Sequence, residues 1–135
     1  MAMNKSLSML VALKLGLVCA IPAASADEAY DRCMKQANAT TVTYGACGSD
    51  WLKREDGKLN AAWKRVFGQA QGQTRTDLLD EQRAWIAYKE KACGFYANGD
   101  WGTDGRAIQY PICQAAVIAA RTHDIEAIGK FLAPQ

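Results

Sequence analysis

Residues 41–70 of the 135-residue chain read TVTYGACGSDWLKREDGKLNAAWKRVFGQA, and this stretch decides the fold class. Most of its apolar residues recur at steps of three and four, which is the spacing of one face of an α-helix. Lys53 and Asp56 fall on the opposite, polar face, and Thr40 or Thr41 suits the N-cap position. The stretch therefore predicts a long amphipathic helix. Its apolar residues are Tyr44, Cys47, Trp51, Leu52, Leu59, Trp63, Val66 and Ala70.

The chain on either side of this helix shows the same period. A short apolar stripe in residues 30–37 predicts a helix before it. A third helix is predicted to begin at Thr76 or Asp77 and to run to Cys93, and Pro111 suits the first turn of a last helix. No alternating strand pattern, repeat or linker is present in the sequence. We therefore predict an all-α bundle of three or four helices.

Residues 1–26 have the features of a secretory signal peptide. A positive residue precedes an apolar stretch, and Ala24-Ser25-Ala26 forms a small-x-small cleavage site. The alternatives are a membrane anchor, which Lys14 in the apolar stretch disfavours, and a lipid attached at Cys19. We predict a mature domain of residues 27–135 in the periplasm or the medium, without stable insertion in a membrane.

The charge of the predicted mature domain is balanced. Of the 16 Lys and Arg residues, Lys5 and Lys14 precede residue 27, which leaves 14 against 14 Asp and Glu. A nucleic-acid binder needs a basic face, and a net charge of zero offers none. The same balance gives no general attraction to an anionic membrane. We therefore expect neither partner.

Four cysteines follow the predicted signal peptide, namely Cys33, Cys47, Cys93 and Cys113. An even number in an exported chain of this size points to two disulfides. Of the three possible pairings we favour Cys33–Cys47 and Cys93–Cys113, because each closes a short loop between neighbouring helical segments. The chain has no C-x-x-C motif and His123 is its single histidine, so a zinc site is disfavoured. We expect no metal and no cofactor.

The mature domain is poor in catalytic residue types. Any serine–histidine pair would have to combine Ser49 with His123, and His123 lies among residues typical of a surface, such as Arg121. Asp100 and Asp104 share one segment and could act as the paired carboxylates of a glycan hydrolase. Acidic side chains in a solvated loop are more often only solubilising. We therefore expect a binding protein rather than an enzyme.

Residues 94–105, GFYANGDWGTDG, contain four glycines and no helical stripe, which predicts a loop. Trp51, Trp63 and Trp85 fall on helical apolar faces and are expected in the core. Trp101 stands in the loop instead, where exposed aromatic residues are typical binding anchors. The alternative is that Trp101 folds back over the core. The candidate partner-binding residues are Tyr96, Asp100, Trp101, Asp104 and Arg106.

Spaced motifs cover most of residues 33–125. They are the Cys33 and Cys47 spacing, Lys58-Leu59-Asn60-x-x-Trp63, Gln82-x-x-Trp85, Tyr88-Lys89-Glu90-x-x-Cys93, and Cys113 followed by Arg121. Together they resemble the LprI-type lysozyme inhibitor family of small exported helical domains. The resemblance implies that the protein partner is a lysozyme and that its inhibition protects bacterial peptidoglycan. The competing hypothesis is a binding or structural module for another partner in the cell envelope.

Overall fold

The computed structural model describes residues 27–133, and the predicted signal peptide lies outside them. Its longer helices are α1 (Glu28–Gln36), α2 (Thr41–Gln69), α3 (Gly72–Gly94) and α5 (Tyr110–Leu132). Three short elements connect α3 to α5: η1 (Phe95–Ala97), α4 (Gly102–Asp104) and the π-helix η2 (Gly105–Gln109). Residues 27–133 contain no strand, and the prediction of an all-α bundle is confirmed.

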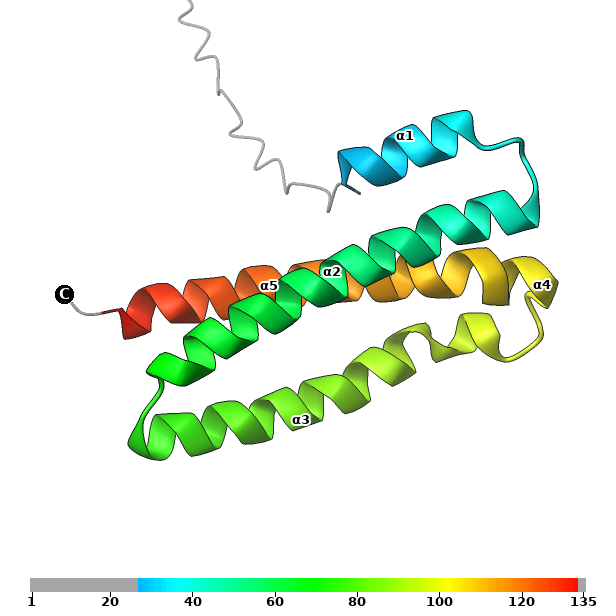
Figure 1. Ribbon diagram of the computed structural model, residues 1–135. Helices are drawn as coiled ribbons and strands as arrows, with labels where there is room; N and C mark the ends of the chain where they lie inside the picture. The colour runs from blue at the N-terminus through cyan, green and yellow to red at the C-terminus, as the bar shows by residue number, and fades with distance from the viewer. Residues whose placement is uncertain (1–26, 134–135) are drawn as a thin grey trace, which may run out of the picture.

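Helix α2 is the centre of the bundle, and α5 packs along it in the same direction (Figure 1). Helix α3 runs antiparallel to α2, and α1 lies against α2 on the side away from α3. Glycines allow α2 to approach η2 closely near one end and α5 closely near the other. A Cβ atom on Gly45 would lie 2.7 Å from the carbonyl oxygen of Ala107, and one on Gly129 would lie 2.7 Å from Cγ2 of Val66. Glycine lowers the helix propensity at these two positions, but its lack of a side chain allows the tight packing.

The hydrophobic core lies where α2, α3 and α5 meet. Trp51 is buried, as expected, whereas Trp63 and Trp85 pack against the core only partly buried. Ile118 and Ile125 of α5 are almost fully enclosed, and each contributes roughly 2 kcal/mol by removal from water. The buried members of the core are Leu59, Ala62, Val66, Ala70, Leu78, Ile118 and Ile125.

The third helix begins earlier than predicted. Thr76 and Asp77 were expected to open it, but α3 begins at Gly72. The chain ends α2 at Gln69, extends over Ala70 and Gln71, and reverses within these two residues. A buried Ala70 fixes this corner against the core, so tertiary packing decides the boundary rather than a capping side chain. The predicted role of Pro111 in the first turn of the last helix is confirmed.

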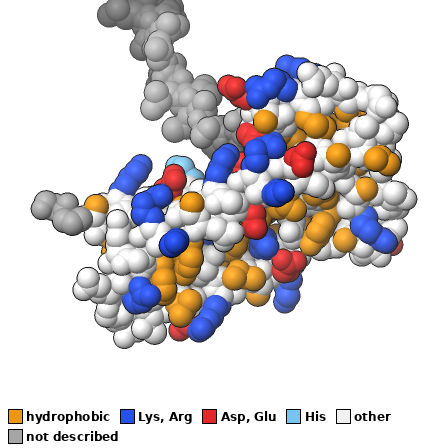
Figure 2. Space-filling view, viewed as in Figure 1, with side chains coloured by type: hydrophobic (Ala, Val, Ile, Leu, Met, Phe, Trp, Pro, Cys, Tyr) orange, Lys and Arg blue, Asp and Glu red, His pale blue; other side chains and the backbone are white. Residues whose placement is uncertain are grey.

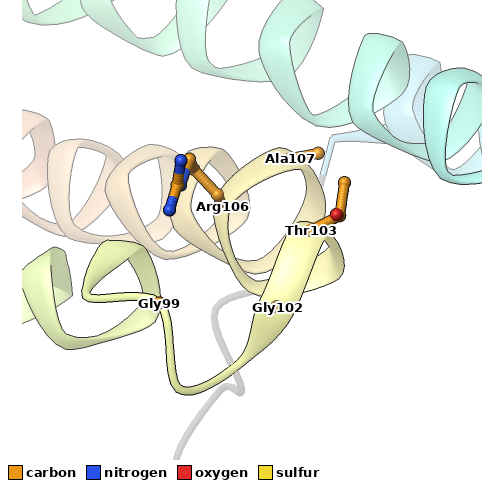
Figure 3. Close-up of a pocket in the computed structure, with 5 residues that line it drawn as sticks. All are labelled: Gly99, Gly102, Thr103, Arg106 and Ala107. Atoms are coloured by element: carbon orange, nitrogen blue, oxygen red, sulfur yellow. The ribbon is translucent and has the colours of Figure 1, made fainter.

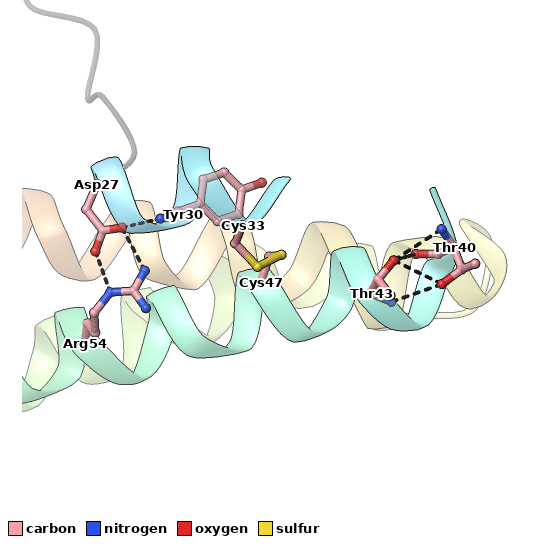
Figure 4. The surroundings of a disulfide bond; sticks show 7 residues. All are labelled: Asp27, Tyr30, Cys33, Thr40, Thr43, Cys47 and Arg54. Carbon is pink, nitrogen blue, oxygen red and sulfur yellow. Dashed lines mark hydrogen bonds and ion pairs between the residues drawn. A yellow bond between two sulfur atoms is a disulfide. The ribbon is translucent and has the colours of Figure 1, made fainter. Parts of the chain in front are cut away.

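Helix α1 is held on α2 by one disulfide and one ion pair (Figure 4). Cys33 is bonded to Cys47, with 5.7 Å between their Cα atoms, which confirms the favoured pairing. Asp27 caps α1 by accepting the backbone N–H of Tyr30 at 2.7 Å. The same carboxylate accepts Nε and Nη2 of Arg54 at 2.6 and 2.7 Å. Because α1 contains no buried residue, these contacts largely determine its position on α2.

The Asp27–Arg54 ion pair makes stability depend on pH. The hydrogen-bonded guanidinium of Arg54 lowers the pKa of Asp27 from 3.8 to about 2. A carboxyl group whose pKa is lower in the folded state stabilises the fold above pH 3.8 and loses that effect as the pH falls toward 2. Because the pair is partly exposed, we expect Asp27→Asn to lower the free energy of unfolding by only about 1 kcal/mol at pH 7.

Urea denaturation of both proteins between pH 7 and pH 2 tests this expectation. Asparagine keeps an N-cap acceptor, so the variant isolates the charge. The difference between the two proteins should shrink below about pH 4 and vanish below about pH 2. A difference that stays constant over the whole range would show that the ion pair does not contribute.

A buried arginine joins α3 to α5. Arg121, which the sequence places among surface residues, is only 5% exposed, so that expectation is wrong. Its Nε and Nη2 donate to Oε1 of Gln82 at 3.0 and 2.7 Å. Its two terminal nitrogens donate to the two carboxylate oxygens of Glu81. The guanidinium also lies 5.5 Å from the ring centroid of Trp85.

This cluster compensates for the small apolar contribution of α3. Only Leu78 and Cys93 of that helix are buried. The hydrogen bonds from Arg121 to Glu81 and Gln82 therefore fix the position of α3, because few buried apolar residues do so.

Candidate functional site

The candidate partner-binding residues lie at the end of the bundle where α3 turns back into α5 (Figure 1). We call residues 95–109 the end connection. The sequence predicted a loop without helical structure, but the end connection consists mainly of η1, α4 and η2. Two of its glycines have positive φ angles, +107° at Gly99 and +63° at Gly102. The glycines therefore permit a defined reversal of the chain rather than a long irregular loop.

Three aromatic rings gather on the end connection. The ring centroids of Phe95 and Tyr96 are 4.1 Å apart, and those of Tyr96 and Trp101 are 5.3 Å apart. Phe95 is 47% exposed and Trp101 is 55% exposed, whereas Tyr96 is partly buried. Phe95, which directly precedes Tyr96, is not among the site residues predicted from the sequence. The structure thus brings two of the predicted residues together and adds a third ring.

Gly105 leaves room for the side chain of Trp101 to pack against the backbone. A Cβ atom at this position would overlap the side chain of Trp101 and would lie 2.6 Å from the carbonyl oxygen of Tyr96. Gly105 itself is buried. Trp101 therefore has one side against the backbone of η2, while much of the rest of its surface faces solvent.

The two acidic residues of the end connection have separate partners. Asp104 accepts a hydrogen bond from Oγ1 of Thr41 at 2.7 Å, which ties the end connection to the first turn of α2. The backbone N–H of Asp100 donates to the side-chain oxygen of Asn98 at 2.9 Å, which closes a local turn. Both aspartates are exposed. Both carboxylates therefore lie at the surface of the end connection, whose backbone is fixed by these hydrogen bonds.

Arg106 lies between two hollows of the surface. The first has a volume of about 360 Å³ and is lined by Gly99, Gly102, Thr103, Arg106 and Ala107 (Figure 3). The second, of about 530 Å³, shares the last three of these residues and extends along α2 from Thr41 and Val42 to Leu52. Val42 is 80% exposed. The end connection and the start of α2 thus form one uneven surface with apolar and polar parts.

On the face shown in Figure 2, charged side chains are interspersed over the middle of the molecule and become fewer toward the end that carries α4. Next to that end, Tyr110 donates a hydrogen bond to Glu90 at 3.3 Å and accepts one from Gln114 at 3.0 Å. Burial, together with the nearby Glu90, raises the pKa of the Tyr110 hydroxyl. The first residue of α5 therefore remains a neutral hydrogen-bonding group near neutral pH.

The predicted second disulfide holds the base of this surface. Cys93 is bonded to Cys113 with 5.7 Å between their Cα atoms, which confirms the other favoured pairing. Cys93 is fully buried. Within residues 27–133, no group of three or more His, Cys, Asp or Glu side chains is arranged to hold a metal ion. In the same range, no helix has the length and apolar character needed to cross a membrane.

The chain matches the model of a known protein family. A family model described as "Lysozyme inhibitor LprI" matches residues 33–125. The matched range includes both disulfides, the Arg121 cluster and the whole end connection. No curated protein and no solved structure matches the chain.

Proposed function

The chain belongs to the LprI family of lysozyme inhibitors, and from this premise we propose that it is an exported protein that binds and inhibits a lysozyme. It acts by occupying the enzyme rather than by catalysing a reaction, and it thereby protects bacterial peptidoglycan. Its place of action is the periplasm or the medium. The two disulfides support this localisation, since such bonds persist in oxidising compartments.

The exposed aromatic cluster on the end connection carries this proposal. Trp101 is 55% exposed, although the segment around it is fixed by the Cys93–Cys113 disulfide and the Thr41–Asp104 hydrogen bond. A binding segment that is already ordered loses little conformational entropy when its partner docks. Aromatic residues in the centre of an interface commonly contribute most of the binding energy. We therefore assign partner contact to Tyr96, Asp100, Trp101, Asp104 and Arg106, with Phe95 beside them.

A lysozyme turbidity assay with the purified mature protein tests the proposal. We expect the wild-type protein at micromolar concentration to slow the lysis of bacterial cells. Trp101→Ala should weaken inhibition by about 30-fold, which corresponds to a loss of about 2 kcal/mol in binding. Phe131→Ala is a matched control, because this aromatic residue is 87% exposed but lies in the last turns of α5.

Thermal unfolding of the same variants separates binding from folding. If Trp101 only seals the end of the bundle, Trp101→Ala lowers the melting temperature and leaves inhibition per folded molecule unchanged. That outcome would contradict the role of Trp101 in binding.

A second candidate function is binding of another envelope partner by the same surface. The balanced charge favours it, because a basic lysozyme would attract an acidic inhibitor more strongly than a neutral one. A wild-type protein that leaves lysis unchanged in the turbidity assay would favour this second candidate.

A further inference from the structure

Arg106 differs from the other six arginines of the chain. Five of them pair with carboxylates, and Arg75 donates to the carbonyl oxygen of Phe67 while lying over its ring. Within residues 27–133, Arg106 takes part in no ion pair and no side-chain hydrogen bond. Its charge is therefore available to a partner. The five arginines paired with carboxylates are Arg32, Arg54, Arg65, Arg83 and Arg121.

The backbone that carries Arg106 is fixed on three sides. Gly105, directly before it, is packed beneath Trp101, and Ala107, directly after it, has its carbonyl oxygen against Gly45 of α2. Asp104 is held by Thr41. The side chain is exposed and extends beside the first hollow (Figure 3). A free side chain on a fixed backbone is the arrangement that a specific contact requires.

The chemistry of this position suits an ionised carboxylate. A guanidinium group is planar, keeps its charge at every relevant pH and binds a carboxylate through two parallel hydrogen bonds. Val42 and Ala107 line the adjoining hollow, so a docked partner would exclude water from part of the contact. Exclusion of water strengthens a paired charge.

The cleft of a glycoside hydrolase contains such a group, since two carboxyl side chains flank the bond to be cleaved and one of them stays ionised. We infer that Arg106 pairs with the ionised catalytic carboxylate of the lysozyme, while the neighbouring aromatic cluster of Phe95, Tyr96 and Trp101 fills part of the cleft. This inference rests on the proposed function and assigns the contact that blocks the reaction.

A binding experiment with two lysozymes tests the inference. The first is an active lysozyme, and the second carries an amide in place of the ionised catalytic carboxylate. We expect Arg106→Ala to bind the active enzyme about 30-fold more weakly than wild type does. Arg106→Lys should lose about tenfold, because an ammonium group cannot form the two parallel hydrogen bonds. Against the amide enzyme, wild type and Arg106→Ala should bind within about threefold of each other.

Arg83→Ala is the matched control, because Arg83 is an exposed arginine of α3 outside the end connection. Melting temperatures of all variants verify that they fold. If wild type does not bind active lysozyme, the proposed function fails, and this inference fails with it. If wild type binds and Arg106→Ala binds equally well, only the inference is overturned. Equal losses of Arg106→Ala against both enzymes would also overturn it, because Arg106 would then contact another group.

Discussion

Replacement of Arg121 by alanine is expected to lower the free energy of unfolding by about 3 kcal/mol. The side chain is 5% exposed and provides every hydrogen bond that joins Glu81 and Gln82 of α3 to α5. Its removal leaves a cavity beside Trp85 and takes away the positive partner of a carboxylate. Glu81 is itself 51% exposed and can be solvated again, which keeps the loss near the lower end of the range for a broken buried pair.

Urea denaturation of wild type and two variants measures this effect. Arg121→Met fills much of the same volume without donors, so it separates the packing contribution from the hydrogen bonds. Arg83→Ala is the control on the same helix, where an exposed ion pair is worth less than about 1 kcal/mol. An Arg121→Ala midpoint that moves no further than that of Arg83→Ala would contradict the role of the cluster.

Removal of the second disulfide has an expected effect of similar size. The double variant Cys93→Ala, Cys113→Ala should lose about 2–4 kcal/mol, because the unfolded chain is no longer constrained and a buried contact disappears. The bond spans 20 residues and encloses the whole end connection. We therefore also expect the aromatic cluster to lose its fixed arrangement.

Denaturant midpoints report the stability of this variant, and near-ultraviolet circular dichroism reports the order of its aromatic rings. Cys33→Ala with Cys47→Ala is the comparison, because that bond holds α1 and lies outside the end connection. The comparison variant should lose less of the total aromatic signal, because Phe95, Tyr96 and Trp101 lie outside the loop that its disulfide closes. Midpoints that hardly move for Cys93→Ala, Cys113→Ala would mean that the bond adds no stability.

The sequence predicts those parts of the fold that depend on local pattern. The helix over residues 41–69 follows from its apolar period, and the disulfides follow from cysteine pairs that close short loops between neighbouring helical segments. The hydrogen-bonded cluster around Arg121 could not be predicted in this way. It depends on Glu81 and Gln82, which lie about 40 positions earlier and face Arg121 only because α3 and α5 pack together.

The sequence indicates the residues proposed as the binding site, but not the conformation of the segment that carries them. Glycines signal a break in regular structure, yet they do not reveal its cause. Gly99 and Gly102 permit positive φ angles, whereas Gly105 leaves room for Trp101. Phe95 falls in the same glycine-rich segment as Tyr96 and Trp101, but the sequence does not show that the three rings come together.

The order of the cysteines has a consequence for oxidative folding. Each disulfide joins two cysteines that follow one another within residues 27–133, so the two loops are neither nested nor interlocked. A chain that enters an oxidising compartment from its N-terminus presents Cys33 and Cys47 before Cys93 arrives. An oxidase that joins thiols in their order of arrival therefore produces the native bonds directly. We expect maturation of this protein to require such an oxidase but not a disulfide isomerase.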